Sequence, residues 1–232
     1  KNAENEEMIE RVIKSILWVV GGFKIYLGGN DELVKAMQQV FSYNGGRKFD
    51  VEFMERVYKQ KFEVVACNYD EVPASVEASI PAGGHLEGNR IGFDAGGSDR
   101  KVSAVVNGEV IHSEEVVWFP KTNEDPEYHY QGILDSFRRA AEKMPSVDAI
   151  GVSSAGIYID NEVRVASLFI KVPQDKFDEQ VVDMYIRAAK EYGDVPLTVA
   201  NDGDVTALAG SMSLKSGQVL GIAMGTSEAA GY

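Results

Sequence analysis

The sequence predicts an α/β protein in which a mixed β-sheet flanked by helices follows a small, separate α/β unit. Helical and strand patterns alternate through residues 1–70, which is typical of a compact α/β unit. Residues 71–89 are rich in Pro, Ala and Gly and keep no period, so we interpret them as a linker or crossover. From residue 90 to residue 232 the order becomes β-hairpin, helix and strand. The change of pattern across this break predicts two domains.

The first unit is predicted to hold three helices and two strands. Apolar residues at helical spacing predict a first helix over residues 4–18, and a second begins at Asn30 or Asp31 and runs to about residue 41. We expect Asp50 to cap the third helix. Residues 23–27 and 62–68 are predicted to be strands, so helices and strands alternate.

The second unit begins with a predicted β-hairpin. A short buried strand, residues 91–94, leads into Gly96-Gly97-Ser98, and the strand pattern resumes over residues 102–106. Asn107-Gly108 then favours a two-residue turn. A third strand, with room for a bulge, is expected over residues 110–119.

Helices and strands then alternate to the end of the second unit. Two of the strands, at 147–153 and 196–201, are expected to be buried on both faces. In chain order we predict a helix at 126–144, a buried strand at 147–153, a turn at 154–156, a hairpin of 157–159 with 163–165, a long amphipathic helix at 175–192, a buried strand at 196–201, a helix at 202–214 and a strand at 219–224.

The segment from Asp94 to Ser98 combines residues that suit phosphate chemistry. Gly96 and Gly97 let backbone N–H groups approach a phosphate closely, and Ser98 can add a hydrogen bond. Asp94 can hold a hydrated magnesium ion. A tight β-turn that needs glycine for its backbone angles explains the segment equally well when it is taken alone.

Two later strands are also expected to end in polar loops. Asp202 stands where a strand meets a helix, so a helix N-cap is the structural alternative to a catalytic role. Gly225-Thr226-Ser227 offers further N–H groups and hydroxyls for phosphate, or a simple hairpin turn. Because ligands bind at the carboxyl ends of strands in open α/β sheets, we expect the three loops to converge on one cleft.

Composition excludes several classes of function. A net charge of −13 argues against nucleic acid as a partner, and residues 1–90 carry 11 Lys and Arg against 14 Asp and Glu. No apolar run is long enough for a membrane span, and the acidic start does not fit a secretory signal, so we expect a cytoplasmic protein. The chain lacks an initiator Met and stops within a glycine-bearing motif, which indicates part of a longer protein. Whether it forms a homodimer is left open.

The three motifs in this order resemble the actin-like ATPase superfamily, whose nucleotide-binding domain has a ribonuclease H-like fold. A hairpin opening with D-x-G-G-[ST] is followed by a strand ending in Asn-Asp and then by a strand ending in Gly-Thr. Within the superfamily, residues 90–232 look most like the first domain of the ROK group of glucokinases and N-acyl-hexosamine kinases. The resemblance implies an ATP- and Mg²⁺-dependent sugar kinase acting on a hexose or amino-hexose.

The resemblance also implies residue roles at the site. Asp202 would be the general base, Asn201 would hydrogen-bond a sugar hydroxyl, and a loop including Ser154 and Gly156 would line the sugar. Asp94 would contact magnesium. The residues implied to bind Mg-ATP are Asp94, Gly96, Gly97, Ser98, Lys101, Gly225, Thr226 and Ser227.

The sequence departs from the group in two of the motifs. Ala200 stands where the group usually has Glu. The second phosphate motif reads Gly225-Thr226-Ser227-Glu228-Ala229 where the group has G-T-G-x-G, and the extra side chains, one of them acidic, would crowd or repel the phosphates. Two alternatives to a sugar kinase follow. One is a non-catalytic sensor that responds to a sugar or nucleotide, and the other is an acid phosphotransferase of the superfamily.

Overall fold

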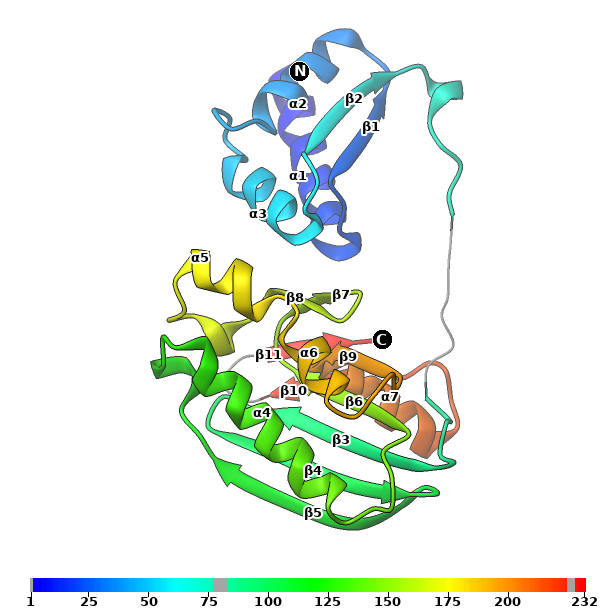
Figure 1. Ribbon diagram of the computed structural model, residues 1–232. Helices are drawn as coiled ribbons and strands as arrows, with labels where there is room; N and C mark the ends of the chain where they lie inside the picture. The colour runs from blue at the N-terminus through cyan, green and yellow to red at the C-terminus, as the bar shows by residue number, and fades with distance from the viewer. Residues whose placement is uncertain (1, 77–82, 225–227) are drawn as a thin grey trace. The chain divides into compact units, whose positions relative to one another are not determined.

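The computed structural model describes residues 2–76, 83–224 and 228–232, and the chain divides into two compact units, residues 1–80 and 81–232 (Figure 1). Each unit has its own apolar core. None of the helices in the described residues is both long and apolar enough to cross a membrane.

The first unit packs three helices against a two-stranded parallel sheet. Asn30 caps α2, because its side chain accepts hydrogen bonds from the backbone N–H groups of Glu32 and Leu33. The elements are α1 (Asn2–Val20), β1 (Lys24–Gly28), α2 (Asp31–Val40), α3 (Lys48–Tyr58), β2 (Glu63–Cys67) and a 3₁₀ turn, η1 (Tyr69–Glu71). Their core contains Leu17, Met37, Phe41, Val51, Met54 and Phe62. The predicted helices and strands of this unit are therefore confirmed.

The predicted capping role of Asp50 is wrong. Helix α3 begins at Lys48, and Asp50 lies inside it with only 5% of its surface exposed. Its carboxylate accepts a hydrogen bond from Nε1 of Trp18 on α1 and pairs with Arg47. Asp50 thus links α1 to α3. A carboxylate that is buried without a hydrogen-bond donor is costly, so Asp50 binds Trp18 and Arg47.

The second unit is built on a five-stranded mixed sheet of order β5-β4-β3-β6-β9. The strands β5, β4 and β3 are antiparallel neighbours, whereas β6 and β9 run parallel to β3. The strands are β3 (Asn89–Ala95), β4 (Asp99–Val106), β5 (Glu109–Val117), β6 (Ala149–Ser154) and β9 (Leu197–Asn201). The carboxyl ends of β3, β6 and β9 consequently lie at one edge of the sheet.

The predicted hairpin between β4 and β5 is confirmed. Val106 pairs with Glu109, and both Asn107 and Gly108 have positive φ, as a type I′ turn requires. The pairing register shifts after Ala104, which is the bulge that the sequence allowed for.

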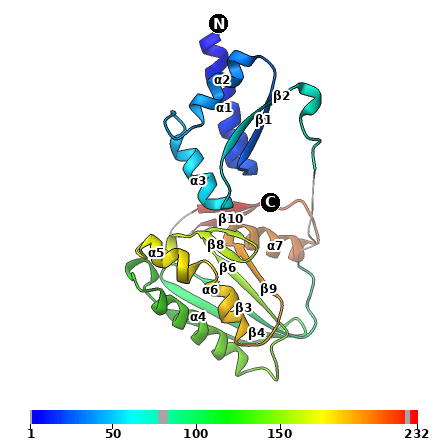
Figure 2. The same cartoon turned by 45° about the horizontal axis from the view of Figure 1, so that its top comes forward.

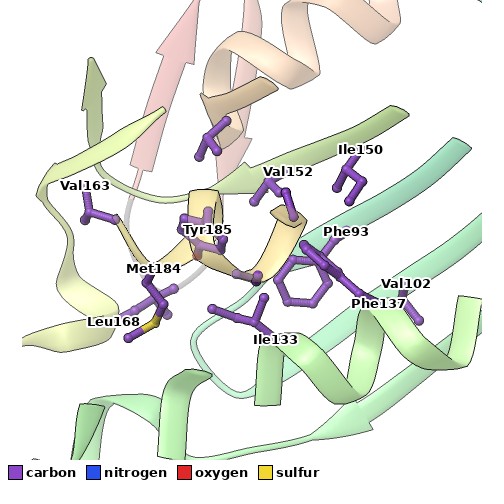
Figure 3. Packing of buried hydrophobic residues seen from close by; sticks show 14 of the residues in the cluster. Phe93, Val102, Ile133, Phe137, Ile150, Val152, Val163, Leu168, Met184 and Tyr185 are labelled. Atoms are coloured by element: carbon purple, nitrogen blue, oxygen red, sulfur yellow. The ribbon is translucent and has the colours of Figure 1, made fainter. Parts of the chain in front are cut away.

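Helices α4 (Pro126–Ala141) and α6 (Met184–Lys190) lie over one face of this sheet (Figures 1 and 2). Alternate strand residues point to them, so Phe93, Val102 and Val152 are buried among Ile133, Phe137 and Tyr185 (Figure 3). The rings of Phe93 and Phe137 meet edge to face, 5.5 Å apart.

The expectation that β6 and β9 are buried on both faces is wrong. Gly151 and Thr198, which alternate with the buried Val152 and Val199, are exposed. The sheet therefore has one apolar face and one face of small and polar residues. Short apolar runs do not distinguish a strand buried on one face from a strand buried on both.

The long helix predicted over residues 175–192 is broken. It consists of α5 (Gln174–Lys176), a π-helical turn η4 (Phe177–Val181) and α6. The carbonyl oxygen of Val182 accepts a hydrogen bond of 2.9 Å from the backbone N–H of Val163, on strand β8 (Glu162–Val165). Because this carbonyl oxygen accepts a hydrogen bond from β8, the series of hydrogen bonds within the helix is interrupted at Val182. Strand β8 forms the predicted hairpin with β7 (Ile157–Ile159).

The last predicted strand, β10 (Gly221–Met224), lies outside the five-stranded sheet. It pairs with β11 (Glu228–Gly231), and this hairpin packs on α7 (Asp202–Leu214). A Cβ on Gly203 would lie 2.8 Å from the backbone nitrogen of Ala230, so the helix and hairpin backbones are in close contact. Met224 is 81% exposed, so β10 is not a fully buried strand.

Candidate active site

Three strand ends of the sheet are in register at one edge. Ala95, Ser154 and Asn201 pair across β3, β6 and β9. The residues that directly follow these three strands in the chain are Gly96, Ala155 and Asp202, and all three line one cavity. Since neighbouring strands lie about 4.8 Å apart, Gly96 and Asp202 are separated by roughly 10 Å.

The cavity at this edge has a volume of about 210 Å³ and is bounded mainly by polar residues. It brings together Asp202 and the segment from Asp94 to Ser98, as the sequence predicts for the first phosphate motif and the candidate base. The residues that line it are Asp94, Ala95, Gly96, Gly97, Ser98, Asp99, Lys121, Ala155, Ser167, Leu168 and Asp202.

The loop after β3 leaves several polar groups available to a ligand. Among the described residues, the backbone N–H groups of Gly97 and Ser98 meet no hydrogen-bond acceptor. The Asp94 carboxylate, on the sheet face opposite α4, likewise has no hydrogen-bond or ion-pair partner in the described part of the chain. Such groups need water or a ligand, and together they can take up a phosphate with its counter-ion.

Trp118 holds this loop in place. Its indole Nε1–H donates to the Gly96 carbonyl oxygen at 2.8 Å, and its backbone N–H donates to that of Ser98 at 3.1 Å. Trp118 is only 3% exposed. Sequence analysis did not identify this residue, because nothing in its local pattern shows that its indole reaches a loop more than twenty residues away.

Asn201 and Asp202 take different positions at the start of α7. Asn201 is the N-cap: its Oδ1 accepts from the Gly203 N–H at 2.8 Å, and its Nδ2 donates to the Gly156 carbonyl oxygen at 2.9 Å. Asp202 is therefore released from capping, although its Oδ1 also accepts from the Gly203 N–H, at 3.1 Å. No other hydrogen bond to this carboxylate arises from the described residues.

Ser154 and Gly156 do not line the cavity, unlike Ala155 between them. Ser154 is fully buried and its Oγ accepts a hydrogen bond of 3.5 Å from the hydroxyl of Tyr185. Gly156 has a φ of +149°, and a Cβ there would lie 2.4 Å from the Val165 carbonyl oxygen. Both residues therefore shape the loop that presents Ala155.

Tyr185, which is buried, and Tyr158, which is half-buried, support the same loop. The hydroxyl of Tyr158 donates to the Ala155 carbonyl oxygen at 3.4 Å, and its ring lies against that of Tyr185. Burial raises the pKa of Tyr185 to about 12 and raises the pKa of Tyr158 well above its ordinary value. Both hydroxyls consequently remain protonated donors at neutral pH.

Lys101 is committed to a neighbouring carboxylate. Its Nζ lies 2.6 Å from Oδ2 of Asp99, whose hydrogen bond raises the pKa of Lys101, while the same bond lowers the pKa of Asp99. Lys101 is the register partner of Asp94 on the neighbouring strand, β4, but it does not line the cavity.

Sequence analysis missed Lys121, Ser167 and Leu168 in the cavity wall. They lie on two 3₁₀ turns, η2 (Pro120–Thr122) and η3 (Ser167–Phe169), which follow different strands and carry no motif. The second phosphate motif, Gly225, Thr226 and Ser227, lies outside the described residues.

The donor set suits a hard cation shared with a phosphate ligand. Within the described residues, no three Asp, Glu, His or Cys side chains gather to hold a metal alone. Magnesium is commonly held by one or two carboxylates together with substrate phosphates and water. Asp94, unpaired beside the glycine loop, fits that arrangement.

Comparison with known proteins gives likeness of fold only. No family model matches the chain, and no curated protein matches it. Among the similar solved structures is the polyphosphate/ATP-glucomannokinase of Arthrobacter sp. strain KM, at 21% identity and a TM-score of 0.48, covering 62% of this chain and 57% of that one. The ROK hexokinase of Thermus thermophilus is 16% identical with a TM-score of 0.42, covering 61% and 45%.

A transcriptional regulator and RuvC are also among these structures. The ROK-family transcriptional regulator described as a homologue of the E. coli MLC protein is 15% identical, with a TM-score of 0.42, covering 62% of this chain and 36% of that one. RuvC of Thermus thermophilus, in complex with a Holliday junction, is 19% identical with a TM-score of 0.35, covering 57% and 82%. The chain spans about half the length of the sugar kinases it matches.

The mixed sheet with its antiparallel hairpin and parallel continuation decides the fold class. This arrangement fits the α/β, ribonuclease H-like fold that the sequence predicts. The fold alone does not decide the chemistry, which has to be argued from the cavity.

Proposed function

We propose that this chain takes part in the ATP-dependent phosphorylation of a sugar hydroxyl, on a hexose or an amino-hexose. The observation that supports the proposal is the shared cavity. Asp202, after β9, and the loop from Asp94 to Ser98, after β3, line it together although β6 lies between their strands. A proton acceptor and a phosphate cradle are the two parts that such a transfer requires.

The loop after β3 would bind the phosphates. The N–H groups of Gly97 and Ser98 are directed donors for phosphate oxygens, and Asp94 would hold the magnesium ion. Bound magnesium would neutralise charge on the phosphates during transfer. Trp118 keeps the loop in one conformation, so little reorganisation is needed when the ligand binds.

Asp202 would act on the acceptor. Its carboxylate lies at the other side of the cavity and would accept the proton of the attacking sugar hydroxyl. Asn201 holds the first turn of α7 and thereby directs this carboxylate. Because both polar ends of the Asn201 side chain already have a backbone partner, its proposed bond to a sugar hydroxyl would use the remaining amide hydrogen or lone pair.

The experiment measures ADP release by the full gene product that carries this chain. Mg-ATP is supplied with a panel of hexoses, amino-hexoses and N-acyl-hexosamines, and acetate represents carboxylate acceptors. We expect release that depends on one sugar class and not on acetate. Release with acetate alone would indicate an acid phosphotransferase instead.

A non-catalytic sensor is the second candidate, and one observation favours it. Glu228 begins β11 directly after the second phosphate motif, which places an acidic side chain next to it in sequence. No ADP release with any acceptor, together with a rise in melting temperature on adding sugar or ATP, would support the sensor.

A further inference from the structure

Lys121 is the single Lys or Arg among the described residues that line the candidate active site. Three carboxylates, those of Asp94, Asp99 and Asp202, line the same cavity. Lys101 neutralises Asp99 by an ion pair at 2.6 Å. A phosphate ligand would therefore be repelled by the carboxylates of Asp94 and Asp202, and Lys121 carries the positive charge among the described lining residues that would offset this repulsion.

The ammonium group of Lys121 is not committed elsewhere. No carboxylate of the described residues lies within ion-pair distance of it, whereas Lys101 has two. Lys121 is half-buried and lines the cavity, so its charge is screened less than that of a fully exposed lysine.

The backbone that carries Lys121 is fixed to the glycine loop. Pro120 is fully buried, and its carbonyl oxygen lies 3.0 Å from Nε2 of the buried His129. Two residues earlier, Trp118 donates to the carbonyl oxygens of both Gly96 and Ser98. The position of Lys121 relative to the loop is thus set by buried contacts on both sides of Phe119.

We propose that Lys121 is a phosphate-binding residue of this site, contacting non-bridging oxygens of the phosphate chain across the cavity from the N–H groups of Gly97 and Ser98. The inference rests on the proposed function and adds to it the cation that positions the phosphoryl donor. A lysine suits this task because its ammonium is a compact charge on a flexible stem that can follow phosphates during transfer. A phosphate chain is the class of ligand required, with or without a nucleoside.

The test compares Lys121→Gln with wild type in titration calorimetry, using Mg-ATP and magnesium tripolyphosphate as probes. We expect both probes to bind about tenfold or more weakly to the variant, because a charge-assisted hydrogen bond is lost. Lys143→Gln is the matched control, and its binding should change by less than about threefold, since Lys143 is an exposed lysine that does not line the cavity. Lys121→Arg should restore most of the affinity because it retains the charge.

Unfolding temperature without ligand separates binding from folding. Lys121→Gln should melt within about 2 °C of wild type, because a half-exposed side chain without partners contributes little stability. Equal binding of both probes by wild type and Lys121→Gln would overturn the role of Lys121 and leave the proposed function intact. Failure of wild type to bind either probe would overturn the phosphate site itself and both proposals with it.

Discussion

Gly96 is the residue whose identity the structure constrains most clearly at the site. A Cβ at this position would lie 2.5 Å from the carbonyl oxygen of Asp99, at the point where β3 turns into β4. Backbone atoms do not yield as flexible side chains do, so any side chain here would displace the loop. The sequence allows two interpretations of this segment, a phosphate site and a tight turn that needs glycine. Steric exclusion at Gly96 is the physical reason why the turn needs glycine.

Gly96→Ala should therefore destabilise the second unit and disturb the loop. We expect a loss of about 1–3 kcal/mol in the free energy of unfolding, as for overpacked positions. Urea denaturation followed by circular dichroism measures it. Gly151→Ala is the control, because a Cβ there would meet no atom within 4 Å. A variant as stable as Gly151→Ala would show that the turn adapts without cost.

Residue types at strand ends could be predicted from sequence, whereas partners distant in the chain could not. Asp94, Gly97 and Asp202 follow strand patterns directly, so their place at one sheet edge was predictable. Lys121 and Trp118 reach the site from the connection between β5 and α4. Only the fold places that connection beside the glycine loop.

At the scale of elements, α4 is attached to the sheet by a charged network as well as by its apolar face. Asp135 on α4 accepts hydrogen bonds from Arg100 of β4, at 2.8 Å, and from Arg138 and Arg139 of its own helix. Arg100 also donates to Ser136 at 2.7 Å. Because Arg100 follows the glycine loop closely in sequence, this network supports the start of β4 behind the site.

The network makes part of the stability dependent on pH. Burial alone would raise the pKa of Asp135, but hydrogen bonds from Arg100 and Arg139 outweigh it and hold the pKa below its ordinary value. A lowered folded pKa stabilises the protein above the unfolded value of about 3.9, and the contribution is lost as pH falls through the folded pKa.

Asp135→Asn should lower the free energy of unfolding by about 1–3 kcal/mol at pH 7, because Arg100 loses a largely buried partner. The difference from wild type should shrink as the pH falls below about 4, where the wild-type carboxyl also becomes protonated. Denaturation curves at pH 7, 5 and 3 measure the trend. A difference that stays constant with pH would mean that the charge of Asp135 does not contribute.

Helix boundaries were predicted correctly where a residue next to the boundary sets them. They were predicted wrongly where a side chain or backbone group binds a partner that is distant in the chain. Asn30 caps α2 as its sequence position indicates. The break at η4 follows from the hydrogen bond between Val163 and Val182, which no periodicity over residues 174–190 could reveal. Asp50 is a similar case, because its partner Trp18 belongs to another helix.

At the scale of the whole chain, the candidate site lies in the second of the two units. Residues 1–80 form a compact unit with a two-stranded sheet and a separate core. The second unit contains the cavity and every candidate site residue that the structure describes. The order of the main helices and strands was predictable in both units, but the division of the helix predicted over 175–192 and the strand β11 were not predicted. The exclusion of β10 from the main sheet was not, because it depends on close contact between the backbones of α7 and the hairpin.

In the proposed function, the ends of β3 and β9 act as a single site, with Asp202 accepting a proton from the substrate. Asp202→Asn keeps the shape of the side chain and removes its capacity as a base. Asp204→Asn is the matched control, because Asp204 also belongs to the first turn of α7, is exposed and does not line the cavity.

The most direct measurement is sugar-dependent ADP release by wild type and these two variants, beside their affinities for Mg-ATP and the sugar. We expect Asp202→Asn to lose about 10²–10⁴-fold in kcat, as for removal of a general base, with affinities within about threefold of wild type. Asp204→Asn should turn over like wild type. Undiminished turnover by Asp202→Asn, or an equal loss in both variants, would contradict the assignment of Asp202.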